Sequence, residues 1–123
     1  MQFRSVLMGV VAVTGLQAAM PAQSETGGEG LFKQKCALCH VVKPGAKSSI
    51  GPNLFGLSTR PAGSLPGFQY SKALSASKLV WTPASLDKFV AAPNKIVAGT
   101  MMVVSVPDPK ARAAIVTYLL TLK

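Results

Sequence analysis

Acidic residues, histidine and cysteine are all scarce in this chain of 123 residues. It contains 4 Asp and Glu side chains, 1 His and 2 Cys. A hydrolase that relies on paired carboxylates has almost nothing to work with, and a Ser-His-Asp triad would depend on the single histidine. With 49% hydrophobic and 14% charged residues, the chain is not a disordered polyelectrolyte. Its length predicts a single domain.

The N-terminal segment has the pattern of an export signal. Met1–Arg4 is a short basic start, and an apolar run without charge extends from Val6 to Ala19. Ala22 and Ser24 then occupy the −3 and −1 positions of a cleavage site before Glu25. The run is shorter than the roughly 20 apolar residues that a membrane span needs, which favours cleavage over an uncleaved anchor helix.

Cleavage there would divide the chain into a signal peptide, residues 1–24, and one domain, residues 25–123. Loss of Arg4 would leave 12 basic and 4 acidic side chains, so the net charge would fall from +9 to +8. Of the 11 Gly and 9 Pro of the chain, 5 Gly and 4 Pro lie between residues 43 and 67. A small domain with such a segment cannot fill a dense core with side chains alone, so another component is expected to supply core volume.

Capping signals predict a mostly α-helical fold of four to five short helices. Thr26 to Glu29 fits the S/T-x-x-E capping box, and a helix is expected from there to about Ala37. Residues 43–67 show no sustained period and are expected to form a loop. Further helices are expected over residues 71–76, over residues 83–91 between Thr82-Pro83 and Pro93, and after Asp108-Pro109.

The expected last helix carries one apolar stripe with helical spacing. Its members are Ala111, Ala114, Ile115, Tyr118, Leu119 and Leu122. No segment alternates cleanly between apolar and polar residues, and no internal repeat is present. The sequence therefore predicts a single helical domain without strands.

Both cysteines and the only histidine fall in one window, Cys36-Ala37-Leu38-Cys39-His40. C-x-x-C-H is the signature of c-type haem attachment. Two thiols three residues apart at the end of a helix can each add across one haem vinyl group. His40 then lies under the iron as the proximal ligand. The window therefore predicts one haem c, bound through Cys36 and Cys39.

Three other interpretations of this window lack supporting residues. A thioredoxin-type redox disulfide would need a βαβ context, and no such strands are predicted. A zinc site needs four ligands, and no further Cys or His exists to complete it. A simple disulfide of an exported protein remains an alternative, but it gives the adjacent histidine no role.

The sixth position on the iron needs a ligand other than the single histidine. A thioether sulfur is the natural candidate, and after removal of residues 1–24 only Met101 and Met102 remain. Both follow Gly99-Thr100 in an expected loop, away from any helical stripe. This favours a ligand over core filler, although spacing alone does not choose between the two neighbours.

Several short motifs accompany this window along the chain. They are Gly51-Pro52-Asn53-Leu54, Gly63, Pro66-Gly67-Phe68-Gln69-Tyr70, Trp81, Pro93, Gly99-Thr100 before a methionine, and Ile115 with Tyr118. Together with the C-x-x-C-H window, they resemble the class I c-type cytochromes of mitochondria and bacterial periplasm. The resemblance extends from Gly28 to about Leu119 and implies the cytochrome c fold, a few short helices and loops around one haem.

The resemblance also implies roles for particular residues. In the family, the proline of the G-P-N-L motif offers its carbonyl to the proximal histidine, which is Pro52 here. The axial methionine of this register is Met102. The remaining residues implied to bind the cofactor are Thr100 and, at the haem propionates, Arg60, Tyr70 and Trp81. Plain core packing is the alternative for the two aromatic residues.

Two residues depart from the family pattern on the methionine side of the haem. Phe89 stands where the family usually has Tyr, and Leu74 stands where Asn is common. Both differences remove polar groups. The hydrogen-bond network that the family has there is therefore not expected to form in the same way.

Two protein ligands would leave no open iron position for a substrate, so an electron carrier is predicted rather than an enzyme. We expect a monomer in the periplasm, without stable membrane insertion or a nucleic-acid partner. Its positive charge favours docking to acidic faces of redox proteins, such as cytochrome reductase or oxidase complexes or a periplasmic dehydrogenase. The alternatives are a haem-bearing subunit of an exported dehydrogenase complex, a membrane-tethered cytochrome, and a haem sensor or peroxidase.

Overall fold

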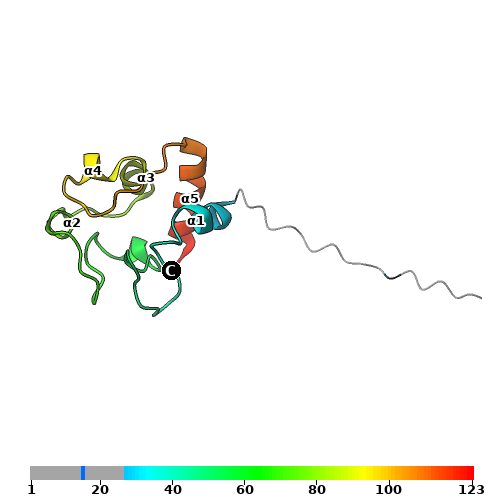
Figure 1. Ribbon diagram of the computed structural model, residues 1–123, viewed down its shortest axis with the longest axis horizontal. Coiled ribbons are helices and arrows are strands. Elements are labelled where there is room, and N and C mark those ends of the chain that lie inside the picture. The colour runs from blue at the N-terminus through cyan, green and yellow to red at the C-terminus, as the bar shows by residue number, and fades with distance from the viewer. Residues whose placement is uncertain (1–14, 16–26) are drawn as a thin grey trace, which may run out of the picture.

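Residues 27–123 form five α-helices and one 3-10 turn, joined by long loops (Figure 1). The computed structural model describes Gly15 and residues 27–123, so the expected signal peptide lies almost entirely outside the described residues. In chain order the elements are α1 (Gly28–Lys35), η1 (Leu57–Thr59), α2 (Lys72–Ala76), α3 (Pro83–Ala91), α4 (Pro93–Ile96) and α5 (Pro109–Thr121). The mostly helical prediction is confirmed.

Extended pairing is almost absent from the part of the chain that the structure describes. It contains one isolated antiparallel β-bridge there, between Pro61 and Val80. None of the helices within residues 27–123 is long and apolar enough to cross a membrane.

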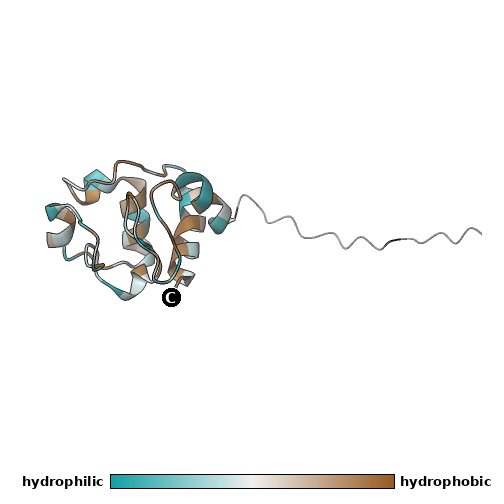
Figure 2. Cartoon of the chain, turned by 60° about the horizontal axis from the view of Figure 1, so that its bottom comes forward, coloured by the Kyte–Doolittle hydropathy of each residue, from teal (hydrophilic) through white to brown (hydrophobic). Residues whose placement is uncertain are grey.

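The first and last helices lie side by side, as Figure 1 shows. A Cβ atom at Gly28 would lie 2.7 Å from Cβ of Tyr118, so only glycine permits this approach. One turn later Phe32 is buried, and its ring lies 5.7 Å from the ring of Tyr118. Most other residues of α1 are hydrophilic (Figure 2). Phe32 is therefore the buried residue of this helix in the core, and the partly buried Leu31 packs against the same cluster.

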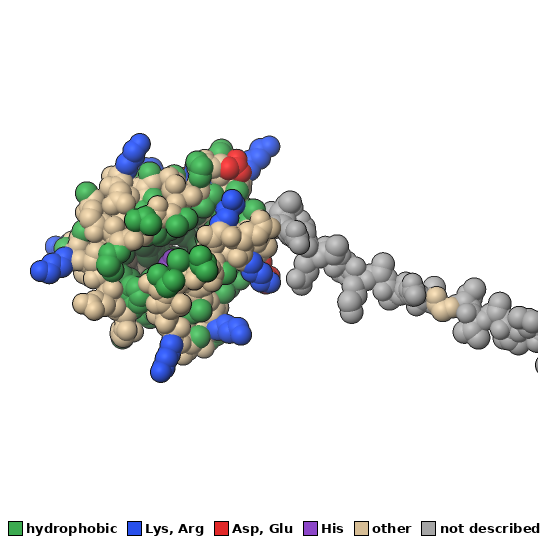
Figure 3. All heavy atoms as spheres, in the orientation of Figure 1, with side chains coloured by type: hydrophobic (Ala, Val, Ile, Leu, Met, Phe, Trp, Pro, Cys, Tyr) green, Lys and Arg blue, Asp and Glu red, His purple; other side chains and the backbone are tan. Residues whose placement is uncertain are grey.

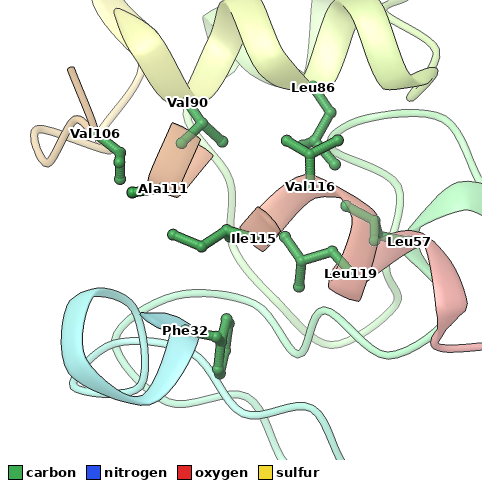
Figure 4. Close-up of a cluster of buried hydrophobic side chains, with 9 residues drawn as sticks. All are labelled: Phe32, Leu57, Leu86, Val90, Val106, Ala111, Ile115, Val116 and Leu119. Carbon is green, nitrogen blue, oxygen red and sulfur yellow. The ribbon is translucent and has the colours of Figure 1, made fainter. Parts of the chain in front are cut away.

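The hydrophobic core centres on α5 (Figure 4). The apolar stripe expected from the sequence includes three of its buried positions, Ala111, Ile115 and Leu119, and Ile115 is completely inaccessible to solvent. Val116 is also buried, beside this stripe. The other members of the cluster are Phe32 from α1, Leu57 from η1, Leu86 and Val90 from α3, and Val106 from the segment before α5.

The boundaries of α3 follow the predicted signals. The Thr82 hydroxyl accepts a hydrogen bond from the N–H of Ser85, whose own hydroxyl accepts one from the N–H of Thr82, which forms a capping box. Pro83 occupies the first helical position, and the helix ends before Pro93. The second proline also begins the short helix α4, which the sequence analysis did not anticipate.

Two other expectations need correction. Gly27 is the N-cap residue of α1, and Thr26, where the capping box was expected, lies outside the described residues. The carboxylate of Glu29 pairs with Lys33 at 2.8 Å, and the helix ends at Lys35 rather than Ala37. The expected loop over residues 43–67 contains the turn η1, whose Leu57 side chain is buried in the core.

Candidate cofactor site

One cavity brings the predicted site residues together. Figure 3 shows it as a hollow in one face of the molecule, with hydrophobic side chains around it and the histidine inside. All residues proposed for the cofactor line this cavity: Cys36, Cys39, His40, Pro52, Arg60, Tyr70, Trp81, Thr100 and Met102, together with Met101.

The wall of this cavity is also the wall of the hydrophobic core. The side chains that belong to both are Leu57, Leu86, Val90, Val106, Ile115 and Leu119. The sequence analysis gave none of them a role at the site. The i, i+4 spacing of Leu86 and Val90 on α3 is the signal that could have assigned them to one inward face. The two departures from the family pattern, Leu74 and Phe89, line the same cavity.

The turn after α1 places the C-x-x-C-H window against the cavity. Cys36 is the C-cap of the helix, and its carbonyl accepts hydrogen bonds from the N–H groups of Cys39 and His40, each at 3.0 Å. The two cysteines are not joined in a disulfide. Burial raises the pKa of the Cys36 thiol, and the nearby Lys35 opposes this effect. Both cysteine side chains therefore border the cavity as separate groups.

The histidine ring is positioned by the backbone that follows it. Nδ1 of His40 lies 2.8 Å from the carbonyl oxygen of Pro52. A carbonyl oxygen can only accept a hydrogen bond, so Nδ1 carries the proton and Nε2 keeps a free lone pair. A Cβ atom at Gly51 would lie 2.7 Å from Nδ1 and 2.9 Å from Nε2. The glycine therefore leaves the space that the ring occupies.

Protonation of His40 is disfavoured by its surroundings. Burial lowers the pKa of the imidazole, and the hydrogen bond to the Pro52 carbonyl offsets only part of this effect. The ring is therefore neutral at pH 7. A neutral imidazole with a free Nε2 is the form that binds a metal ion.

Asn53 holds the loop that carries Pro52. Its side-chain amide donates hydrogen bonds to the carbonyls of Lys43, at 2.7 Å, and Ala46, at 3.0 Å. Its Oδ1 accepts one from the N–H of Phe55 at 2.9 Å. Asn53 is buried although it is polar. Its burial is tolerated because these hydrogen bonds satisfy its side-chain amide. The sequence analysis quoted Asn53 within a motif but gave it no function.

Arg60 and Tyr70 border the cavity with part of their hydrogen-bonding capacity already used. The Arg60 guanidinium donates to the carbonyl oxygens of Phe55, at 2.8 Å, and Asn53, at 2.6 Å. The Tyr70 hydroxyl oxygen accepts from the N–H of Leu65 at 3.3 Å. Both side chains keep further N–H or O–H donors, so the geometry is compatible with an anionic group at this edge.

The remaining predicted residues lie in the segment just before α3 and in the segment after α4. The Trp81 ring packs edge-on against Phe89, with 5.1 Å between the ring centroids. Thr100 is buried, and its hydroxyl oxygen accepts a weak hydrogen bond from the N–H of Met102 at 3.5 Å. Met102 is half-buried, whereas Met101 is 61% exposed. The difference in burial favours Met102 as the residue directed into the site.

These observations fit a haem group. The cavity is apolar, it has two unpaired cysteines and a neutral histidine at its wall, and donors for carboxylates stand at its edge. A zinc site does not fit, because the described residues contain no group of three or more His, Cys, Asp or Glu side chains placed to hold a metal ion.

Comparison with known proteins agrees with this geometry, although no protein-family model matches the chain. Cytochrome c2 of Rhodopila globiformis is 43% identical over 84% of this chain and 97% of the relative. Cytochrome c2 of Rhodomicrobium vannielii is 39% identical over 94% and 93% of the two chains. Cytochrome c of Guizotia abyssinica is 40% identical over 83% and 93%.

A solved structure shares the fold as well as the sequence. The cytochrome c2 of Rhodospirillum centenum superimposes with a TM-score of 0.73 and 34% identity, over 78% of this chain and 95% of the other. Membership of one family explains both the C-x-x-C-H window and the apolar cavity beside it. The chain belongs to the class I c-type cytochromes, electron carriers with a haem c covalently attached through the two cysteines, here Cys36 and Cys39.

Proposed function

We propose that this chain is a soluble periplasmic one-electron carrier whose haem iron is bound by His40 and Met102. The observation that carries this proposal is the hydrogen bond from His40 Nδ1 to the Pro52 carbonyl, in a cavity that Met102 also lines. This bond fixes the ring and leaves Nε2 free. When bound, the haem iron supplies a couple between its ferrous and ferric states.

The protein residues would hold the haem group in place and keep water away from it. His40 is oriented through its second nitrogen, which is the usual way in which proteins fix a ligating imidazole. The apolar wall formed by α3 and α5 excludes solvent. Two protein ligands leave no iron position open, which suits electron transfer and not catalysis on a bound substrate.

Met102 is our choice for the second ligand because it is the less exposed of the two methionines. The N–H of Met102 approaches the hydroxyl of buried Thr100, which ties this residue to the cavity wall. Met101 is also at the cavity but is largely in solvent. Arg60, Tyr70 and Trp81 are proposed to hold the haem propionates, since each carries an N–H or O–H donor.

The two methionines can be separated by substitution. We expect Met102→Ala to abolish the weak red-edge absorption band of the ferric protein, which arises from thioether–iron bonding, because no other sulfur then reaches the iron. Met101→Ala is the matched control and should keep the band. Optical spectra of both ferric variants check this, and the opposite pattern would assign the ligand to Met101.

The positive charge of the protein supports docking to redox partners with acidic faces. The cavity opens on one face of the molecule, and Lys and Arg side chains project around the edge of that face (Figure 3). Lys35 is the lysine that lines the cavity itself, whereas Lys47 and Lys95 are exposed and lie outside its lining. We propose that these charges steer the approach of an acidic partner, such as a reductase, an oxidase or a dehydrogenase.

Hexacyanoferrate(III) is a small anion that oxidises the ferrous protein. The rate of this oxidation reports the electrostatic attraction of an anion to the cavity. The rate should fall about tenfold or more as added salt shortens the Debye length from about 10 Å to about 3 Å. Lys35→Ala should slow the reaction at low salt by several-fold. Lys33→Ala is the control on the same helix, because Lys33 is paired with Glu29 and does not line the cavity. A rate that is independent of salt would contradict electrostatic steering.

We propose that residues 1–24 are a cleaved export signal and that residues 25–123 form the cytochrome domain. The support is the sequence pattern, because this segment lies outside the described residues apart from Gly15. N-terminal sequencing of the haem-containing protein should begin at or within a few residues of Glu25. Recovery of Met1 in the mature protein would instead indicate a retained N-terminal tether.

A further inference from the structure

The mouth of the cavity is bordered by exposed apolar side chains. Ile50, Met101, Val103 and Val104 all line the cavity and are all exposed, and we refer to these four residues as the apolar rim. Met101 is the rim residue that carries a sulfur atom. Its side chain is 61% exposed, whereas the adjacent Met102 is half-buried.

The segment that carries Met101 is loosely held. The N–H of Thr100 bonds to the carbonyl of Val97, and the N–H of Val106 bonds to the carbonyl of Val90. Between these two points, residues 101–105 form no backbone–backbone hydrogen bond with any described residue. Met101 lies in this segment and is exposed over more than half of its surface, so we expect its sulfur to be accessible to reagents in water.

We propose that Met101 is an oxidant-reactive site at the cavity mouth, which hydrogen peroxide converts to the sulfoxide and thereby makes the apolar rim polar. A lone pair of the sulfur attacks one peroxide oxygen, the O–O bond breaks, and water leaves. The sulfur is oxidised by two electrons and the peroxide is reduced. The product is a polar side chain in place of a flexible apolar one.

The neighbouring methionine reacts less readily for two reasons. Met102 is less exposed, and a thioether bound to iron has a lone pair engaged in that bond. The second reason rests on the proposed function. Met101 is therefore expected to take up oxygen first, while the bond between Met102 and the iron persists.

Oxidation at this position changes the surface that a partner would meet. Burial of a methionine against an apolar partner is favourable, and a sulfoxide loses most of this contribution. A partner that places apolar groups on the rim would then bind roughly tenfold more weakly.

The test uses the purified haem-containing protein, treated with increasing hydrogen peroxide. Met101 and Met102 fall in one tryptic peptide, residues 96–110, so fragment-ion mass spectrometry is needed to assign the added oxygen. We expect one oxygen on Met101, at doses that also oxidise N-acetylmethionine amide in a parallel sample. The thioether–iron band of the ferric protein should be unchanged at that stage.

The matched control is Met101→Leu, which keeps the rim apolar without sulfur. It should take up no oxygen at the same dose, and its retention on a phenyl column should not change. The unsubstituted protein should elute earlier after oxidation. Oxygen on Met102 first, no oxygen on Met101, or unchanged retention of the oxidised protein would each overturn the proposal. Absence of the band before treatment would refute the Met102 assignment, while the peptide result still tests Met101.

Discussion

The helices of this chain pack around one apolar cavity, and the wall of that cavity determines their arrangement. Ile115, the most buried side chain of the core, faces that cavity, and α3 and η1 contribute the rest of the wall through residues such as Leu86 and Leu57. Six side chains of the core cluster therefore also line the cofactor site. A haem c held in this cavity would complete the hydrophobic core as well as supply the iron.

Backbone geometry rather than a carboxylate orients the histidine. The carbonyl of Pro52 accepts the proton of Nδ1, and Gly51 leaves the space for the ring. That loop is fixed in turn by the buried amide of Asn53, which bonds to the carbonyls of Lys43 and Ala46. A hydrogen-bond network of neutral groups thus positions the proposed ligand in a chain that has few acidic residues.

Much of this arrangement could be predicted from the sequence, because local signals specify it. Thr82 and Pro83 start α3 as expected, and Asp108 caps α5 through the N–H of Ala111 at 2.9 Å. At α1 the N-cap is Gly27, one residue after the expected Thr26, which lies outside the described residues, and the helix ends at Lys35 rather than Ala37.

What the sequence could not specify depends on contacts between distant segments. The turn η1 is stabilised by burial of Leu57 in the core, which no local pattern indicates. The unequal exposure of Met101 and Met102 likewise follows from where the loop meets the cavity wall. Their spacing left the ligand choice open, the family resemblance favoured Met102, and the lower exposure of Met102 supports the same residue.

The account depends most on the claim that haem completes the core, and one measurement tests this directly. The variant Cys36→Ala with Cys39→Ala, prepared without haem, can be heated while helical circular dichroism is recorded. Leu38→Ser, at an exposed position between the two cysteines, is the haem-containing control. We expect the control to unfold cooperatively and the double variant to show little helix and no cooperative transition. A cooperative transition in the haem-free double variant would contradict the account.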